Sequence, residues 1–456
     1  MNISIKPYKF LLKEKGIDYW DFRFQKIKNT NILGWNNHIK KISRGTKEGY
    51  CVRVLYKNAF GFAYGNLNDD IRNTVKRAIR IAKLLSEETS MKTEIKEHHK
   101  INDYKKSSFK TDPNNIPLKE KIDFVVRNSR ITNKVVKSMQ LQYEESNIEN
   151  LFENSENSLI KQDMTFTALR SVIVGKKGSR TESYSHGTGM MGGYEITKKY
   201  PAMYRDSLRI LKDLFKAENI KGGRLDVIMD PRLASVFIHE ALGHATESDL
   251  VLQNNSCLKN RLNTKIASDI VTVYDSPLGN EWGSYFYDDE GIPAGKTLLI
   301  EKGVLKNYLA SRETAGKSGL KLTGNGRAQF TDNMPLVRMS NTFIKKGKNT
   351  REELIKNVKS GVLLNGTKGG QVNTSQGTFH FSAQYGYLIK NGKLGKPVKG
   401  VSLSGNIFKL LKNIIMISDK REYDFPGFCG KNAQQVPVNG RNPYVLVKDA
   451  LVGGSE

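Results

Sequence analysis

Residues 224–249, RLDVIMDPRLASVFIHEALGHATESD, constrain the fold more than any other stretch of this 456-residue chain. The apolar run LDVIM has the length of a short buried strand, and Asp230 and Pro231 follow it directly. Aspartate is a favoured helix N-cap and proline is tolerated at the first helical position, so a helix is predicted to begin here. His239 and Glu240 then fall in its third turn. The segment therefore predicts a strand-to-helix unit that carries a histidine and a glutamate.

A second histidine, His244, follows His239 by five residues, whereas zinc-peptidase helices typically use a spacing of four. Four residues leave two side chains about 40° apart around an ideal helix, but five residues separate them by roughly 140°. An undistorted helix therefore cannot direct both imidazoles at one metal ion. A one-residue π-bulge would allow it, and so would a helix that ends near Gly243. The alternative is two unrelated histidines without a site.

A catalytic zinc site needs a third protein ligand and one open position. The side chains with suitable chemistry are Glu247, Asp249, His186, His380, Cys257 and Cys429. Glu247 and Asp249 could equally serve as caps or ion-pair partners. Cys257 lies in a polar loop, and Cys429 lies in a tight glycine-flanked turn. Residue chemistry alone leaves the third ligand open.

The chain is too long for one ordinary core, so we expect two domains with a boundary at Gly222-Gly223. Alternation and helical spacing of apolar residues predict two strands about a turn at Asn58, further strands over 134–196, and helices from Asp69 or Asp70 onward, from near Pro117 and over 202–217. After the helix that carries His239, only one further helix is predicted, near 349–359.

The predicted fold class is α+β. An N-terminal α/β domain (1–222) would frame the substrate or a dimer contact. A mainly antiparallel β domain (223–456) would carry the helix with the metal motif.

Charge and cysteine content limit the classes of function. Lys and Arg number 73 against 46 Asp and Glu, which gives a net charge of +27. Such a charge can mark a nucleic-acid binder, but the basic residues are scattered and no nucleic-acid-binding motif is present, which argues against that partner. Three distant cysteines do not form a disulfide framework, and neither a membrane span nor a signal-peptide core is visible. We therefore expect a protein of the reducing cytoplasm.

Ordered motifs along nearly the whole chain resemble the TldD/PmbA family, also called the modulator of DNA gyrase family, and within it the TldD-like metallopeptidase branch. These motifs are GYCVRVLYKNAFGFA, HEALGHATESD, GVLKNYLASRETA, TGNGRAQ, PLVRMSNTFIKKG, GGQVNTSQGTFHFSAQYGYLIKNGK, CGKNAQQVPV and the terminal VGG. The resemblance implies one Zn²⁺ per active subunit, with ligands that match His239, His244 and Cys429. It implies Glu240 as the catalytic base.

The resemblance also implies a dimer, formed with a second copy or with a PmbA-like partner that lacks the metal motif. The implied substrates are unfolded or modified peptides. Two alternative functions are a catalytically silent binding subunit, against which the intact Glu240 argues, and a basic nucleic-acid- or gyrase-associated protein, which only the charge and the family's older name favour.

Two positions depart from the family's usual pattern. Asn157 stands in NSEN where the family tends to have glycine, and asparagine tolerates a positive φ, so a turn can survive there. In CGKNAQQ, Asn-Ala-Gln replaces the usual Gly-Gln after Cys-Gly-Lys. This change bears on the surroundings of Cys429 rather than on the residue itself.

Overall fold

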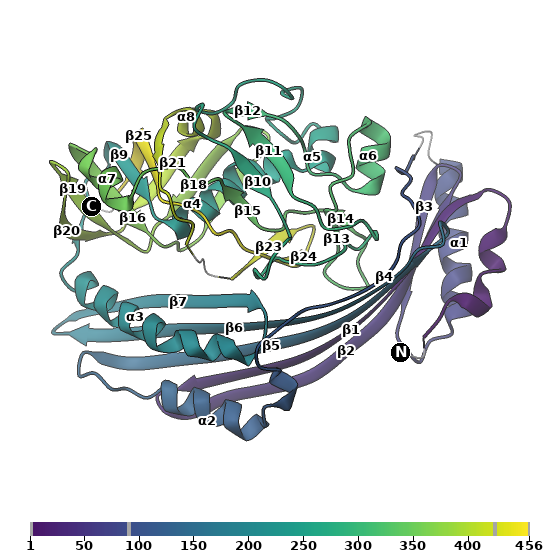
Figure 1. Ribbon diagram of the computed structural model, residues 1–456, viewed down its shortest axis with the longest axis horizontal. Helices are drawn as coiled ribbons and strands as arrows, with labels where there is room; N and C mark the ends of the chain where they lie inside the picture. The colour runs from purple at the N-terminus through teal and green to yellow at the C-terminus, as the bar shows by residue number, and fades with distance from the viewer. Residues whose placement is uncertain (1–2, 89–92, 423–425, 455–456) are drawn as a thin grey trace.

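In the computed structural model, which describes residues 3–88, 93–422 and 426–454, the chain forms two large sheets with helices packed against them (Figure 1). The strands of the first sheet are β1 (Ile17–Trp35), β2 (His38–Tyr56), β3 (Ala59–Gly65), β4 (Asn102–Lys106), β5 (Val136–Asn154), β6 (Leu159–Lys177) and β7 (Arg180–Met191). Their order is β3-β2-β1-β5-β6-β4, and β7 also pairs with β6. Among these described strands, the pairs are antiparallel except β4 with β6.

The first sheet buries its two faces against different parts of the chain. Its helices are α1 (Ile71–Glu88), α2 (Leu118–Asn128) and α3 (Tyr200–Leu214). Successive side chains of a strand point to opposite faces. On β5, Leu141 and Tyr143 pack with the helices α2 and α3, whereas Ile148 and Asn150 face the second half of the chain. The sheet therefore lies between these helices and the C-terminal half.

The second sheet contains β8 (Glu218–Asn219), β9 (Gly223–Met229), β16 (Ser360–Asn365), β17 (Gly370–Asn373), β18 (Thr378–Ser382), β19 (Tyr385–Lys390), β20 (Lys393–Lys399), β21 (Ser402–Asn406), β22 (Ile414–Ile417) and β25 (Val445–Gly453). Its order is β17-β18-β21-β25-β9-β16-β19-β20-β8, with β22 paired to β25. The pairs β9–β16 and β8–β20 are parallel and the others are antiparallel. β9 therefore lies near the centre of the sheet and β17 at its edge.

Smaller strands and short helices complete the C-terminal half. The strands are β10 (Val273–Asp275), β11 (Thr297–Glu301), β12 (Val304–Leu305) and β15 (Thr342–Ile344), and the pairs β13 (Gly326–Arg327) with β14 (Leu336–Val337) and β23 (Gly427–Lys431) with β24 (Gln434–Val438). The helices are α4 (Pro231–Ile238), α5 (Ser248–Leu252), α6 (Arg312–Ser318), α7 (Arg351–Lys356) and α8 (Ile407–Lys412). Among the described residues, no helix has the length and apolar character needed to cross a membrane.

The predicted α+β class is confirmed. In the N-terminal half the helices cover a largely antiparallel sheet rather than alternating with parallel strands. The strand pair about Asn58 and the three N-terminal helices are found, and the helix near 349–359 is α7. The prediction of no other C-terminal helix is wrong, because α5, α6 and α8 are also helical. These helices have only five to seven residues, too few for a clear apolar period. The boundary at residue 222 remains a prediction.

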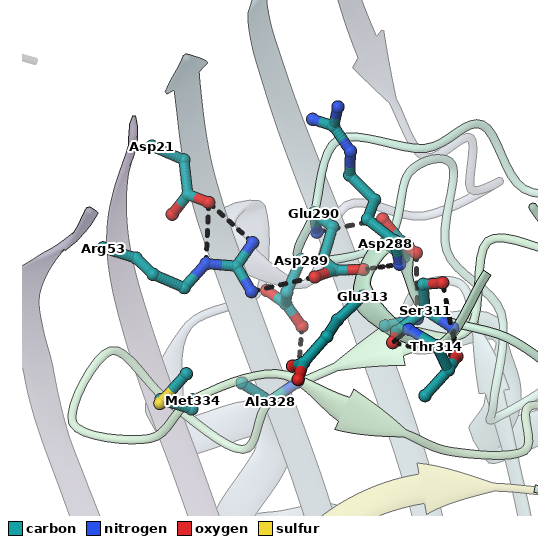
Figure 2. Close-up of polar contacts among 12 residues, drawn as sticks. Asp21, Arg53, Asp288, Asp289, Glu290, Ser311, Glu313, Thr314, Ala328 and Met334 are labelled. Atoms are coloured by element: carbon teal, nitrogen blue, oxygen red, sulfur yellow. Dashed lines mark hydrogen bonds and ion pairs between the residues drawn. The ribbon is translucent and has the colours of Figure 1, made fainter. Parts of the chain in front are cut away.

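Buried charges connect the first sheet to the C-terminal half, and Figure 2 shows Arg53 between Asp21 and Glu290. Arg53 Nη1 donates to Glu290 Oε1 at 2.8 Å, and Arg53 Nε donates to Asp21 Oδ2 at the same distance. Arg312, also buried, pairs with Glu156. Because a buried charge is tolerated only with a partner, each half supplies counter-charges that the other half needs.

Candidate metal centre

The strand-to-helix unit predicted from the sequence is present at the centre of the second sheet. β9 ends at Met229, and Asp230 caps α4 through a hydrogen bond to its Oδ1 from the Leu233 amide at 2.8 Å. The other carboxylate oxygen of Asp230 accepts a hydrogen bond from the Gly366 amide at 3.0 Å. This bond connects the start of α4 to the residue that follows β16. Leu233 is fully buried. The N-cap and the buried face of α4 that contains Leu233 together fix the direction of this helix.

The extra residue between the two histidines is absorbed by a π-helical turn over His239–Gly243. The His244 amide donates to the His239 carbonyl, five residues back, and a 3₁₀ turn over His244–Thr246 follows. The two imidazole rings consequently lie 5.1 Å apart between centroids, at an interplanar angle of 83°. Of the two geometries open from the sequence, the π-bulge is the one found. Such turns occur frequently at functional sites.

Gly243 is required by a close contact rather than by an unusual backbone conformation. Its φ of −53° and ψ of −56° are right-handed helical values, so it does not end the helix in a left-handed turn. A Cβ at this position would lie 1.8 Å from Met339 Sδ. The methionine therefore packs directly on the π-turn between the histidines.

We expect Gly243→Ala to lower the free energy of unfolding by roughly 1–3 kcal/mol, the usual cost of forcing an extra group into a packed core. Chemical denaturation measures it. The matched control is Gly45→Ala, where an added Cβ meets no atom within 4 Å. Equal stability of the two variants would show that Met339 moves away without cost.

Cys429 approaches the histidines from a separate hairpin. It lies on β23 opposite Val436 of β24, and strand alternation leaves Phe428 exposed on one face and Cys429 buried on the other. Cys429 Sγ lies 3.5 Å from His244 Nε2. One donor atom from each of His239, His244 and Cys429 lies within 4.8 Å of the others. The structure therefore brings together these three residues, which come from segments 185 positions apart.

The other candidates for a third ligand do not join this group. Glu247 and Asp249 contact Lys431 instead. His380 Nδ1 lies 2.7 Å from Ser404 Oγ. His186 lies on β7, and Cys257 lies in a loop beside Gly377. In the part of the chain that the structure describes, one group of His, Cys, Asp or Glu side chains is close enough to share a metal ion. It consists of His239, His244 and Cys429.

Glu247 orients His244 rather than standing beside it as a fourth donor. Its Oε2 lies 3.1 Å from His244 Nδ1 and accepts from Lys431 Nζ at 3.0 Å. Lys431 also donates to Asp249 and to the Val337 carbonyl. Burial alone would raise the pKa of Glu247, but His244 and Lys431 lower it to about 2. Glu247 is therefore ionised and holds the imidazole with Nε2 toward Cys429.

Sequence reasoning missed Lys431, although it stands two residues after Cys429. Strand alternation places side chains at i and i+2 on the same face, so a lysine at this spacing is a local signal of a carboxylate near the thiol. The partner carboxylates lie more than 180 residues earlier, however, and no local pattern identifies them.

The charges of these three side chains depend on one another. Burial would raise the pKa of the Cys429 thiol, but His239 and His244 outweigh it and hold that pKa well below its usual value. Burial would lower the pKa of His244, yet Glu247 and Cys429 raise it well above its usual value. A thiolate is thus stabilised by positive charge at the imidazoles, a role that a metal ion can take over.

The turn that closes the Cys429 hairpin contains one of the two departures from the family pattern. Asn432 and Ala433 have φ values of 49° and 60°, which make a two-residue turn with both central residues left-handed. Asparagine suits this conformation, but alanine is strained in it. The buried Arg338 donates to the Cys429 carbonyl and helps hold the strained hairpin in place. At the other departure, Asn157 has a φ of 64°, as its position in a tight turn predicts.

We expect Ala433→Gly to raise the free energy of unfolding by about 0.5–1 kcal/mol, because glycine adopts the left-handed conformation without the Cβ clash. Thermal or chemical unfolding measures the gain. Ala59→Gly, at a strand position where φ is not positive, should instead be destabilising. A loss of stability in both variants would contradict a strained turn at Ala433.

Glu240 lies on the open side of the group. It lines a cavity of about 420 Å³ together with His244, Lys431 and the edge-strand residues Gln371 and Val372. Its Oε2 is 3.8 Å from His244 Nε2, and 26% of its side chain is exposed. A carboxylate in this place can exchange protons with a molecule bound in the cavity.

Comparison with known proteins shows likeness along the whole chain. Residues 222–454 match the model of the PmbA/TldA metallopeptidase C-terminal domain, and residues 20–82 match the PmbA/TldA metallopeptidase domain 1. A metalloprotease of Methanocaldococcus jannaschii is 39% identical over 92% of this chain and 94% of its own length. A zinc metalloprotease TldD homolog of Saccharolobus solfataricus is 30% identical over 98% and 99%.

Solved structures share the fold at lower identity. A protein from Thermotoga maritima, described as a modulator of a DNA gyrase, superposes with a TM-score of 0.83 over 99% of this chain and 100% of its own, at 20% identity. TldE from Thermococcus kodakarensis gives a TM-score of 0.78 over the same shares, at 18% identity. These two structures therefore share the fold of both halves of this chain.

Proposed function

We propose that this chain, a metallopeptidase that belongs to the PmbA/TldD family, hydrolyses peptide bonds at one zinc ion per subunit held by His239, His244 and Cys429. The observation that carries the proposal is the convergence of these three donors within 4.8 Å beside Glu240. Glu240 acts as the general base. The Saccharolobus solfataricus relative is named a zinc metalloprotease, which supports zinc as the metal.

The donor set fits zinc. Two imidazoles and one thiolate are ligands that zinc prefers, and three protein ligands leave a fourth position open, as in catalytic rather than structural sites. The stabilised thiolate of Cys429 is the form that binds a metal. Glu247 supports the set by holding the second nitrogen of His244. Bound here, zinc would supply Lewis-acid polarisation of the scissile carbonyl and lower the pKa of water toward about 7.

The chain's own residues perform the proton transfers. Glu240 extends into the cavity, where its carboxylate accepts a proton from the attacking water. It then returns that proton to the leaving amine, so the same carboxyl group serves both halves of the reaction. Lys431 lines the same cavity, but its ammonium group is paired with Glu247 and Asp249. It therefore positions these carboxylates and does not transfer a proton.

We infer that the substrates are unfolded or modified peptides. The cavity of the metal centre is bordered by β17, the edge strand of the second sheet, through Gln371 and Val372. An edge strand offers unpaired backbone groups to which an extended peptide can add as a further strand. Most backbone groups of a folded protein are already paired, so an unfolded peptide suits this edge better.

The predicted domain boundary, assembly and location belong to the same proposal. Residues 1–222 would frame the substrate or a dimer contact, and residues 223–456 would form the metallopeptidase domain. The likeness to TldE supports a dimeric complex, with a second copy or with a PmbA-like partner. We retain the cytoplasm as the proposed location.

A single set of measurements tests the proposal. Purified protein should contain about one zinc per chain and should cleave an unfolded peptide, with activity lost on chelation and restored by zinc. A catalytically silent binding subunit would show no cleavage in any metal state. A nucleic-acid-associated protein would instead bind DNA with an affinity that falls steeply with salt. No cleavage by zinc-loaded protein would refute the proposed function.

A further inference from the structure

Residues 337–339 form a buried segment that contacts both parts of the chain that carry the proposed metal ligands. All three residues are at most 1% exposed, and they belong to the motif PLVRMSN. None of them is a member of the donor group itself. One of the two ligand-bearing parts is the π-turn His239–Gly243, and the other is the β23–β24 hairpin with Cys429. The segment is therefore placed to determine how far apart these parts lie.

Arg338 makes the contact with the hairpin and reaches both of its strands. Arg338 Nη2 donates to the Cys429 carbonyl on β23, and Nη1 donates to the Gln434 carbonyl on β24 at 3.4 Å. The Val337 carbonyl accepts from Lys431 Nζ on the same hairpin at 2.9 Å. A planar guanidinium holds its N–H groups in a fixed fork. The two bonds of Arg338 therefore fix the hairpin relative to residue 338.

Met339 makes the corresponding contact with the π-turn. A Cβ at Gly243 would lie 1.8 Å from Met339 Sδ, so the thioether occupies the space that this glycine leaves open. Met339 also belongs to the same apolar core as Ala241 and Leu242 of the π-turn. Because Arg338 and Met339 are neighbours in the chain, a single planar and rigid peptide unit joins the two contacts.

The segment is itself anchored by buried hydrogen bonds to residues outside both ligand-bearing parts. The Arg338 amide donates to the Asn325 carbonyl at 2.9 Å, and the Arg338 carbonyl accepts from Asn325 Nδ2 at 2.9 Å. The Ser340 amide donates to Asp275 Oδ1 at 3.0 Å, and its hydroxyl donates to Asp275 Oδ2 at 2.7 Å. Asn325 Nδ2 also donates to Asp275 Oδ2, which closes the network. The segment therefore has a fixed position of its own.

We propose that Arg338 and Met339 are positioning residues of the metal centre, which together hold Cys429 at a set separation from His239 and His244. The inference rests on the proposed function, because it takes these three side chains as the ligands. One donor atom from each of them lies within 4.8 Å of the others. A site that is held in this way loses less binding free energy to the ordering of its ligands.

Binding of Co²⁺, a spectroscopically visible substitute for Zn²⁺, tests the proposal without any measurement of cleavage. Co²⁺ is titrated into the full chain and followed by its visible d–d bands and by the thiolate-to-cobalt charge-transfer band, which reports the bond to Cys429. Arg338→Lys keeps the positive charge but loses the fork that reaches two carbonyls. We expect its dissociation constant for Co²⁺ to rise roughly 10–100-fold, the usual effect of losing an outer-shell partner, and the charge-transfer band to weaken.

Arg312→Lys is the matched control for the loss of a buried guanidinium. Arg312 is 1% exposed, and Nε donates to the Lys96 carbonyl at 2.9 Å. It also pairs with Glu156, and both partners lie outside the metal centre. Arg312→Lys should lower the Tm, but it should change the dissociation constant for Co²⁺ by less than about twofold, as expected for a distant site.

A double-mutant cycle tests Met339 and decides the matter even if Arg338→Lys protein does not fold. The variants Gly243→Ala and Met339→Ala are measured singly and together. Each should weaken Co²⁺ binding by itself, because each changes the packing on the π-turn. The double variant should bind more than about twofold more tightly than the product of the two single effects, since the smaller side chain at 339 leaves room for the added methyl group.

The outcomes separate this inference from the proposed function. An unchanged dissociation constant and charge-transfer band in Arg338→Lys protein would overturn the role of Arg338, as would an equal loss in Arg312→Lys protein. Single effects that simply multiply in the cycle would overturn the role of Met339. If the unaltered protein shows no thiolate-to-cobalt band, the proposed ligand set is wrong and the inference fails with it. If that band is present, failure of the variants to respond leaves the metal centre standing and refutes the inference alone.

Discussion

Glu240→Gln should lower kcat by roughly 10²–10⁴-fold, the range that a general base contributes, while zinc content stays close to that of the unaltered protein. Glutamine has nearly the same size and shape as glutamate but cannot accept the proton. Glu240 is not one of the three donor residues and lies partly exposed in the cavity, so its replacement should not disturb them. Steady-state kinetics on an unfolded peptide, with metal analysis of the same sample, measures both quantities.

A surface glutamate provides the matched control. Glu313 pairs with Lys317 on the exposed side of α6, and Glu313→Gln should leave kcat and zinc content unchanged. Retention of most activity by zinc-loaded Glu240→Gln protein would remove Glu240 from its role as base. Loss of zinc together with activity would show instead that the carboxylate is needed to hold the metal.

Cys429→Ser should weaken zinc binding by more than the roughly 10–100-fold that loss of an outer-shell partner costs, and hydrolysis should fall with it. A neutral hydroxyl replaces the thiolate, so the centre loses both a strong donor and its negative charge. The hairpin itself should persist, since Arg338 binds the backbone carbonyl of residue 429 rather than its side chain. Competition with a chelator of known affinity measures the change.

Cys257→Ser is the control for the chemistry of the substitution. Cys257 is half-buried beside Gly377 and lies outside the donor group, so zinc affinity and activity should be unaltered. If Cys257→Ser loses zinc and Cys429→Ser keeps it, the third ligand has been wrongly assigned.

The start of α4, the helix that leads into His239, could be predicted because its causes are local. Asp230 caps an amide three residues away, and Pro231 needs no hydrogen bond at the first helical position. The path of the chain after His239 could not be decided in the same way. A π-turn and an early helix end both fit the sequence, and the contact that accompanies the π-turn is Met339, 96 residues further along the chain.

The proposed third ligand shows the same limit more clearly. From residue chemistry, Cys429 was one of six candidates, and only the resemblance to a family singled it out. Its approach to His244 depends on the β23–β24 hairpin and on Arg338, which are long-range features. Glu247 and Asp249 were reasonable candidates by proximity in the sequence, but Lys431 occupies both carboxylates in the fold. Spacing therefore identifies chemically suitable residues, and tertiary packing decides which of them meet.

The ion pair between Arg53 and Glu290 also has an evolutionary consequence. Its partners lie 237 residues apart, so recombination between them can separate two residues that depend on each other. A hybrid gene whose first part encodes a neutral residue at position 53 would leave the Glu290 carboxylate buried without its arginine, at a cost of roughly 3–5 kcal/mol. That is a large share of the stability of an ordinary domain. The two positions should therefore vary together among relatives, and viable crossovers should preserve the pair.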